Sequence, residues 1–477
     1  MPIQFIDNSS IDKKKTRTLI RSHVAKGKNL GRTVHRPSRH PKKRQVPASA
    51  VSTVESPSNK KPEVQNGKNL ESSLTIQRQL QEDLSTSLPF DVSRACRRLF
   101  HQFYNLVTVA PYPPELGKAV TPVKGPRIFL QYAFIDEAFF HCIVAMSVAA
   151  STSPFITHQE TTEAFFHLSR SLRLVNQRLA ENGDVALSDT TLAVVIAMTQ
   201  HERMLGYQNH ALIHFEGLQR IITLRGGIST LVSDCPWVAQ KAIRADFDFA
   251  LQLGSPTRYS VEYVPGKTTL DWLRQEYRRA QNQSSDVSLL IACVSGNLQR
   301  VFEDISALAW LVNDSAIHGL KIDEYQFHNV ILLVGYHLLN LRPLNTPIEA
   351  TDQLELSLHL GLAALMAIFF LPLSLKTDIA LLRSCISSAV MGQGYDDKDG
   401  QELLLWLLLT AKISVFRQAD EDIWLIPKIS QVATQLGLST WDHVSQTIQK
   451  FPWVRDFANG TAQRLWDQIA SSLSPPC

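Results

Sequence analysis

Cysteine is scarce in this chain, and its spacing excludes the common metal-binding patterns. The 477 residues include six cysteines, of which no two form a CxxC pair and none has a histidine at metal-ligand spacing. They are Cys96, Cys142, Cys235, Cys293, Cys385 and Cys477. Sparse, unpaired cysteines are typical of proteins in a reducing compartment. We therefore expect free thiols and no structural metal.

Signatures of catalysis are missing as well. The sequence has no GxSxG, no Walker A, no HExxH, and no GxGxxG after a predicted strand. His210 and His214 are spaced to share a helix face, but no carboxylate completes a metal motif around them. The stretch "GYDDKDG" (394–400) fails as a calcium loop, because Tyr395 and Trp406 would occupy ligand positions. We predict no catalytic residue, no metal and no cofactor, and thus a protein that is not an enzyme.

The chain has one uncharged stretch long enough to span a membrane, and it has no apolar leader at its start. The stretch is "LSLHLGLAALMAIFFLPLSL" (356–375), which contains His359, two serines and Pro372. A large core can bury a helix that is apolar on all sides. We interpret this stretch as a core helix and expect no membrane contact.

Acidic residues are absent from 15–44, although this stretch holds eleven Lys or Arg. Residues 1–62 carry fifteen Lys/Arg and three Asp/Glu, a net charge of +12; since the whole chain carries +4, the remainder carries −8. The first 72 residues are also poor in apolar side chains, so burial cannot offset the entropy of ordering them. We predict a disordered basic arm over 1–72 and an all-helical domain over 73–477.

Beyond the arm, hydrophobic spacing predicts helices and little else. Apolar residues recur at steps of three and four, and no hairpin signal or series of short β-branched runs appears. The fold class we predict is an all-α, multi-helix array. The expected helices cover 91–107, 129–151, 159–181, 187–206, 207–227, 236–252, 285–313, 323–342, 350–371, 376–391, 401–417, 420–436 and 455–472.

Two neighbouring segments resemble the middle homology region of fungal-specific transcription factors. In "HFEGLQRIITLRGGISTL" (214–231) a helix ends in a Leu-Arg-Gly-Gly turn, and "KAIRADFDFALQLGSPTRY" (241–259) carries an Arg-Ala-Asp element after Trp237. The pieces "FIDNSS" (5–10) and "IRSHVAKG" (20–27) are similar to the start of one subgroup of that family. The resemblance implies a helical regulatory domain. The matching motif residues are His214, Gly217, Leu218, Leu224, Arg225, Gly226, Gly227, Arg244 and Asp246.

The same motif residues have structural roles that follow from their chemistry. Gly226 and Gly227 suit a helix cap with positive φ, and Arg225 suits the negative end of the helix dipole. Arg244 and Asp246 are two residues apart, so they cannot face each other on a helix and are expected to bond to neighbouring helices. We interpret the constellation as holding the fold, with ligand sensing as the alternative.

The chain departs from the zinc-cluster members of that family. Those proteins bind DNA through six closely spaced cysteines, whereas this sequence has no cysteine before Cys96. The subgroup that it resembles shares this absence. The resemblance therefore implies a nuclear transcription regulator without a zinc cluster, which works with other transcription factors. A non-transcriptional helical scaffold, and a ligand-binding or enzymatic helical protein, are the alternatives.

The basic arm has two compatible uses. "PKKR" (41–44) follows "RPSRH" and forms a compact cationic cluster in an extended chain, which suits an import receptor and predicts nuclear localisation. The arm's cations could also contact DNA phosphates, in a salt-sensitive and sequence-blind manner. The arm residues assigned to import or to nucleic acid are Arg17, Arg21, Lys26, Lys28, Arg32, Arg36, Arg39, Lys42, Lys43 and Arg44.

Overall fold

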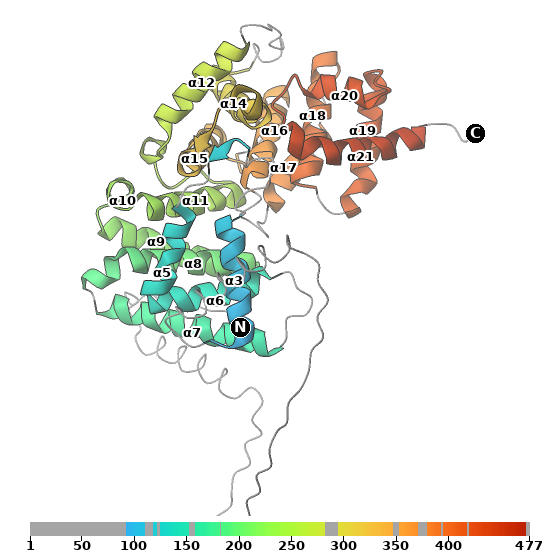
Figure 1. Cartoon of the computed structure of the whole chain (residues 1–477). Coiled ribbons are helices and arrows are strands. Elements are labelled where there is room, and N and C mark those ends of the chain that lie inside the picture. Colours follow the sequence, from blue (N-terminus) through green and yellow to red (C-terminus); the bar gives the residue numbers. More distant parts are fainter. Residues whose placement is uncertain are drawn as a thin grey trace, which may run out of the picture. The chain divides into compact units, whose positions relative to one another are not determined.

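The computed structural model describes residues 92–109, 118–121, 125–151, 158–181, 183–281, 294–346, 353–370, 379–392, 395–416 and 419–473. Seventeen α-helices and three short 3₁₀ helices make up this part of the chain, and its two strands have two residues each (Figure 1). The predicted all-α class is confirmed. The arm predicted over 1–72 lies outside the described residues.

The α-helices make up most of the described residues. In chain order they are α3 (Arg94–Val109), α5 (Gly125–Ile135), α6 (Glu137–Ala150), α7 (His158–Ala180), α8 (Asp189–Met204), α9 (Gln208–Leu224), α10 (Ile228–Asp234), α11 (Pro236–Leu253), α12 (Lys267–Gln281), α14 (Gly296–His318), α15 (Glu324–Leu341), α16 (Gln353–Phe370), α17 (Ala380–Val390), α18 (Lys398–Ser414), α19 (Asp422–Gln435), α20 (Trp441–Ile448) and α21 (Arg455–Leu473). The 3₁₀ helices are η1 (Asp184–Leu187), η2 (Val261–Tyr263) and η4 (Ala419–Glu421).

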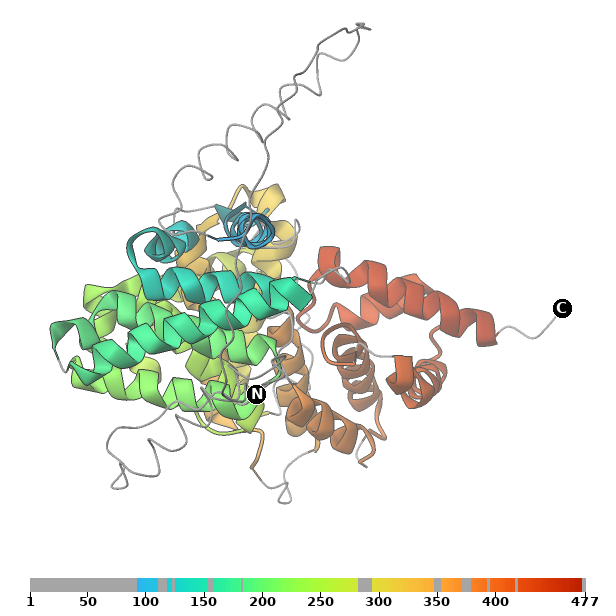
Figure 2. The same ribbon diagram turned by 90° about the horizontal axis from the view of Figure 1, so that it is seen from below.

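Helix α6 forms the centre of the N-terminal group of helices. Its residues 138–148 are all buried, and α3, α5, α7 and α8 pack around it (Figures 1 and 2). The sequence "EAFFHCIVAMSVAA" is apolar on every side, and such a helix is stable in water only when other helices cover all of it. The hydroxyl of Ser171 on α7 donates to the carbonyl of Ala138 (2.7 Å), which fixes the two helices side by side.

The single helix expected over 129–151 is wrong, because the chain breaks at Asp136. This residue has extended backbone angles and caps α6, with its carboxylate accepting the N–H of Phe139 at 2.8 Å. Its other oxygen pairs with Arg178 of α7 at 2.8 Å. A side chain that caps the start of a helix stabilises the interruption of the chain before that helix. Helices α5 and α6 are bent by 119° relative to each other at this point.

Two short strands, which the sequence did not predict, join distant parts of the chain. Strand β1 (Val120–Thr121) pairs in parallel with β2 (Ile322–Asp323), and Val120 lies opposite Ile322. Asp323 then caps α15 by accepting the N–H of Gln326 at 2.9 Å. This pairing brings the segment before α5 to the start of α15.

Three helices were not predicted, and one expected helix lies only partly within the described residues. The missed helices are α10, α12 and α20, two of which have fewer than nine residues. The expected helix over 285–313 is observed as α14, which begins at Gly296 and continues to His318. Short helices carry too few turns for a periodic pattern to be distinctive.

The stretch interpreted as a core helix is α16, and its burial confirms that interpretation. Its residues from Leu356 to Phe369 are buried, and His359 donates from Nε2 to the carbonyl of Leu338 on α15 at 3.0 Å. Within the described residues no single helix is long and apolar enough to cross a membrane, while the bent α5–α6 pair reaches the required length and composition.

Helix α16 packs closely against α18 because a glycine faces a tryptophan. Trp406 is fully buried, and its indole N–H donates to the carbonyl of Pro452 at 2.9 Å. A Cβ at Gly361 would lie 2.2 Å from Cζ3 of that indole. The absence of a side chain at Gly361 therefore sets the distance between the two helices.

Gly361→Ala should destabilise the protein although alanine is the better helix former. The higher helix propensity of alanine stabilises the folded state by about 1 kcal/mol relative to glycine. Overpacking destabilises it by about 1–3 kcal/mol, because the rigid indole ring cannot move away. Gly460→Ala is the matched control, because Gly460 also lies inside a helix and a Cβ there meets nothing within 4 Å. Urea unfolding should show a lower midpoint for Gly361→Ala and an equal or higher one for Gly460→Ala. A raised midpoint for both would contradict this packing.

Candidate functional site

The Leu-Arg-Gly-Gly turn closes α9 with a double-glycine cap. Gly226 and Gly227 have φ values of +107° and +92°, a backbone conformation that favours glycine. The N–H of Gly227 donates to the carbonyl of Ile222 (2.9 Å), and that of Gly226 donates to the carbonyl of Thr223 (3.1 Å). This is the bonding pattern of a Schellman motif. The predicted positive-φ cap is confirmed.

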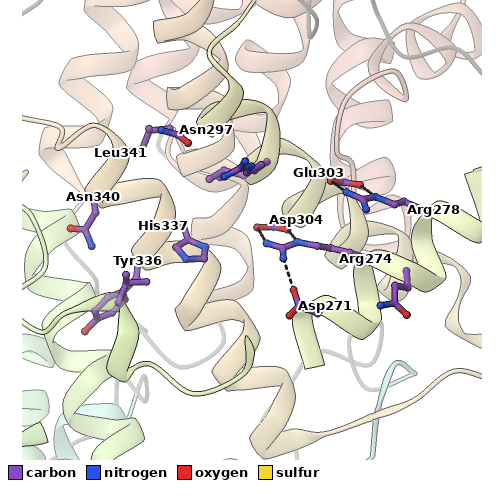
Figure 3. A pocket seen from close by; sticks show the side chains of 14 residues that line it. Asp271, Arg274, Arg278, Asn297, Glu303, Asp304, Tyr336, His337, Asn340 and Leu341 are labelled. Atoms are coloured by element: carbon purple, nitrogen blue, oxygen red, sulfur yellow. Dashed lines mark hydrogen bonds and ion pairs between the residues drawn. The ribbon is translucent and has the colours of Figure 1, made fainter. Parts of the chain in front are cut away.

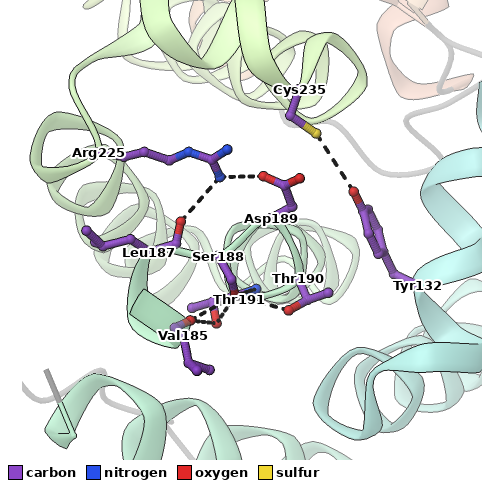
Figure 4. Close-up of polar contacts among 9 residues, drawn as sticks. All are labelled: Tyr132, Val185, Leu187, Ser188, Asp189, Thr190, Thr191, Arg225 and Cys235. Carbon is purple, nitrogen blue, oxygen red and sulfur yellow. Dashed lines mark hydrogen bonds and ion pairs between the residues drawn. The ribbon is translucent and has the colours of Figure 1, made fainter. Parts of the chain in front are cut away.

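Arg225, next to this cap, ties the end of α9 to the start of α8 (Figure 4). Its guanidinium pairs with Asp189 at the start of α8 and donates to the carbonyl of Leu187 at 3.2 Å. Ser188 caps α8 by accepting the N–H of Thr191 at 3.3 Å. An acid at a helix start and a base at a helix end each match the helix dipole, so this one ion pair joins two helices in favourable positions.

The buried carboxylate of Asp246 connects α11 to two other segments. Asp246 is 1 % exposed and accepts the N–H groups of Arg258 (2.9 Å) and Tyr259 (3.0 Å) as well as the hydroxyl of Tyr336 on α15 (2.8 Å). Burial raises the pKa of Asp246, and these hydrogen bonds oppose the shift. The guanidinium of Arg258 then lies over the ring of Phe215 on α9 at 5.3 Å. The two segments that carry the motifs are therefore in direct contact.

Arg244 is linked to a neighbouring helix through Asp248. Its Nε donates to Asp248 one turn later in α11 (2.9 Å), and Arg203 of α8 donates to the other oxygen (2.5 Å). Both Asp248 and Arg203 are at most 4 % exposed. Burial alone would raise the pKa of Asp248, but Arg203 and then Arg244 outweigh it and lower this pKa below its usual value. The carboxylate is ionised and shared by two helices.

His210 and His214 belong to a cluster around a buried glutamate. The Nδ1 atoms of His201 and His210 lie 3.1 Å and 3.3 Å from the carboxylate oxygens of Glu202, which is 2 % exposed. Burial lowers the pKa of His214 to about 4, so that its imidazole is neutral at pH 7. Within the described residues, no three His, Cys, Asp or Glu side chains are placed to hold a metal ion.

The remaining motif residues are divided between core and surface. Leu218 is fully buried, Gly217 is partly exposed, and Leu224 at the end of α9 is 67 % exposed. Trp237 packs on Tyr325 of α15, with ring centroids 4.4 Å apart. Trp237 therefore connects α11 to α15, and none of these residues lines the pocket between α12, α14 and α15.

The four cysteines that the structure describes are free thiols, as predicted. Cys96 and Cys142 are buried, whereas Cys235 and Cys385 are partly exposed. The Sγ atom of Cys235 lies 3.8 Å from the hydroxyl of Tyr132 (Figure 4). Burial raises the pKa of Cys142 and of Cys235, which keeps these thiols protonated and poorly nucleophilic.

A polar pocket of about 700 Å³ lies elsewhere, between α12, α14 and α15 (Figure 3). Fourteen residues line it, and their charges balance. The charged lining residues are Arg274, Arg278, Arg300, Asp271, Glu303 and Asp304.

Arg274 and Arg278 are engaged by acids within the pocket wall. Arg274 donates to both oxygens of Asp304 (2.5 Å and 2.9 Å) and to Asp271 (2.7 Å). Arg278 forks onto Glu303, with Nη2 at 2.7 Å from Oε2. Asp304 is 1 % exposed; burial raises its pKa, and the paired guanidinium of Arg274 opposes the shift. Bidentate pairs of this kind hold both partners in fixed positions.

This pocket was not predicted from the sequence. The signal was present in the missed helix α12, where Asp271, Arg274 and Arg278 recur at steps of three and four and therefore share one helix face. Their partners Glu303 and Asp304 lie on α14, about thirty residues later, and nothing in the linear order pairs them.

Comparison with known families identifies the region that contains these features. The family model of the fungal specific transcription factor domain matches residues 120–369, a little more than half of the chain. The match runs from β1 into α16 and includes both the motif network and the pocket. The chain therefore belongs to this family, which is a transcription factor domain family and not an enzyme family. No curated protein and no solved structure gives a significant match.

Asp248→Asn should strongly destabilise the helical domain. The substitution keeps the shape but removes the negative charge that Arg203 and Arg244 share, and breaking a buried pair costs about 3–5 kcal/mol. Glu276→Gln removes the partner of Arg279 in an exposed pair and should cost less than about 1 kcal/mol. Chemical unfolding of both variants measures the difference. Equal stability losses would show that the Asp248 network does not hold the fold.

Proposed function

We propose that this protein is a nuclear transcription regulator that acts through its helical domain and its basic arm, without a zinc cluster. The match of residues 120–369 to the fungal specific transcription factor domain carries the proposal. A domain of this family without its own zinc cluster needs another route to its genes. Association with other transcription factors supplies that route, and the arm adds a sequence-blind attraction to DNA.

The charge distribution supports separate roles for the arm and the helical domain. Residues 1–62 carry +12 and the remaining residues −8, so phosphate contacts fall to the arm, while the body as a whole repels a polyanion. The helical domain then provides the surface that other proteins recognise. The cluster at 41–44 serves as the address for an import receptor.

Replacing Lys42, Lys43 and Arg44 by alanine should reduce the nuclear-to-cytoplasmic ratio of a fluorescent full-length fusion several-fold. The substitution removes the compact cationic cluster that an import receptor binds. The control is a triple variant that removes the same charge from exposed positions of the helical domain, and it should leave the ratio unchanged. Its substitutions are Arg279→Ala, Lys398→Ala and Arg464→Ala. If the ratio of the variant at Lys42, Lys43 and Arg44 is unchanged, residues 41–44 are not the import signal. A wild-type fusion that stays outside the nucleus would favour a scaffold without a transcriptional role.

Binding to random duplex DNA tests the arm directly. The full chain should lose about 10³-fold in affinity between about 50 mM and about 200 mM salt if the arm neutralises six phosphates, because counterion release sets the slope. A chain that lacks 1–62 should not bind at either salt concentration. Equal binding by both chains would place the contact in the helical domain, and binding by neither would leave the arm as an import address only.

A further inference from the structure

We propose that the pocket between α12, α14 and α15 binds a small organic carboxylate through Arg300. The proposal goes beyond the regulatory role above and rests on which polar groups of the pocket are already engaged. Of the three arginines in the wall, Arg274 and Arg278 are taken by acids. Arg300 lies on α14 and is exposed, and it has no ion-pair partner among the described residues. The lining as a whole is neutral, because Arg274 is shared by Asp271 and Asp304, and Arg300 is the lining arginine whose guanidinium is not engaged by one of these acids.

The other uncommitted groups add hydrogen bonds without adding charge. The amides of Gln275 and Asn297 line the pocket, and neither side chain has a hydrogen-bond partner in the described part of the chain. The imidazole of His337 lies beside Asp304 (Figure 3), and burial lowers its pKa, so that it is neutral at pH 7. A ligand therefore meets the uncommitted guanidinium of Arg300 together with neutral hydrogen-bonding groups, while the acids of the wall are bonded to Arg274 and Arg278. One available guanidinium matches a singly charged anion.

The pocket also has an apolar wall of the size that an organic acid needs. Val261, Val301 and Leu341 line it together with the polar groups, and about 700 Å³ is within the range of small-molecule sites. A single guanidinium forks onto the two oxygens of a carboxylate, and the apolar residues cover the carbon chain. Inorganic phosphate, which carries more charge and has no apolar part, fits this arrangement less well.

The ion pairs of the wall make the site ready for a ligand. Arg274 is held by two acids, and its partner Asp304 is almost completely buried. These side chains do not need to be ordered on binding, and a site that is already ordered loses less entropy when a ligand binds. Arg300 is exposed, and a bound carboxylate would give its guanidinium a partner.

Titration of the purified full chain with hexanoate and benzoate tests the proposal. Each acid is compared with its matched alcohol, hexan-1-ol or benzyl alcohol, and with inorganic phosphate, by calorimetry up to about 10 mM. At least one acid should bind saturably and at least tenfold more tightly than its alcohol, a difference of about 1.4 kcal/mol. Phosphate should bind more weakly than that acid.

Two variants locate the site. Arg300→Gln should weaken binding of the acid at least tenfold, whereas Arg464→Gln, at an exposed arginine of α21, should leave it within about twofold. Asn297→Trp should block the acid by filling the pocket, and circular dichroism confirms that each variant is folded. The proposal is overturned if neither acid binds, if phosphate binds more tightly than both acids, or if Arg300→Gln and Arg464→Gln behave alike.

Discussion

The buried carboxylates of α11 hold the structure together at its middle. Asp248 neutralises Arg203 of α8 and Arg244 of its own helix, while Asp246 binds the backbone that follows α11 and the hydroxyl of Tyr336 on α15. A charge without a partner in such a position costs several kcal/mol, so the helices are held in an arrangement that gives both buried carboxylates their partners. Apolar packing provides most of the stability, and the carboxylates select the geometry.

The apolar helices depend on that arrangement. Both α6 and α16 are apolar on nearly every side and need neighbours all around them. Around α6 the neighbours are held by polar contacts at helix ends, among them Asp136 with Arg178. Around α16 the contact is steric, because Gly361 admits the indole of Trp406. The two cores therefore use different means to reach close packing.

The functional features are distributed over separate parts of the chain. The motif residues hold α8, α9, α11 and α15 together. The pocket uses a different set of helices, in which ion pairs fix the walls and Arg300 remains open to a ligand. The basic arm carries the charge that the helical domain lacks.

The sequence alone determined the helical class, most helix positions, the glycine cap of α9 and the core character of α16, because these follow from local periodicity and backbone preference. It also determined the charged arm. The break at Asp136, the β1–β2 pair, the pairing of Arg203 with Asp248 and the whole pocket were decided by tertiary structure. Each of them depends on groups far apart in the chain, as Arg274 and Asp304 show, and a carboxylate's role depends on which arginine faces it. The spacing of residues in the sequence does not say which arginine faces a given carboxylate. The packing of the helices decides which arginine lies within reach.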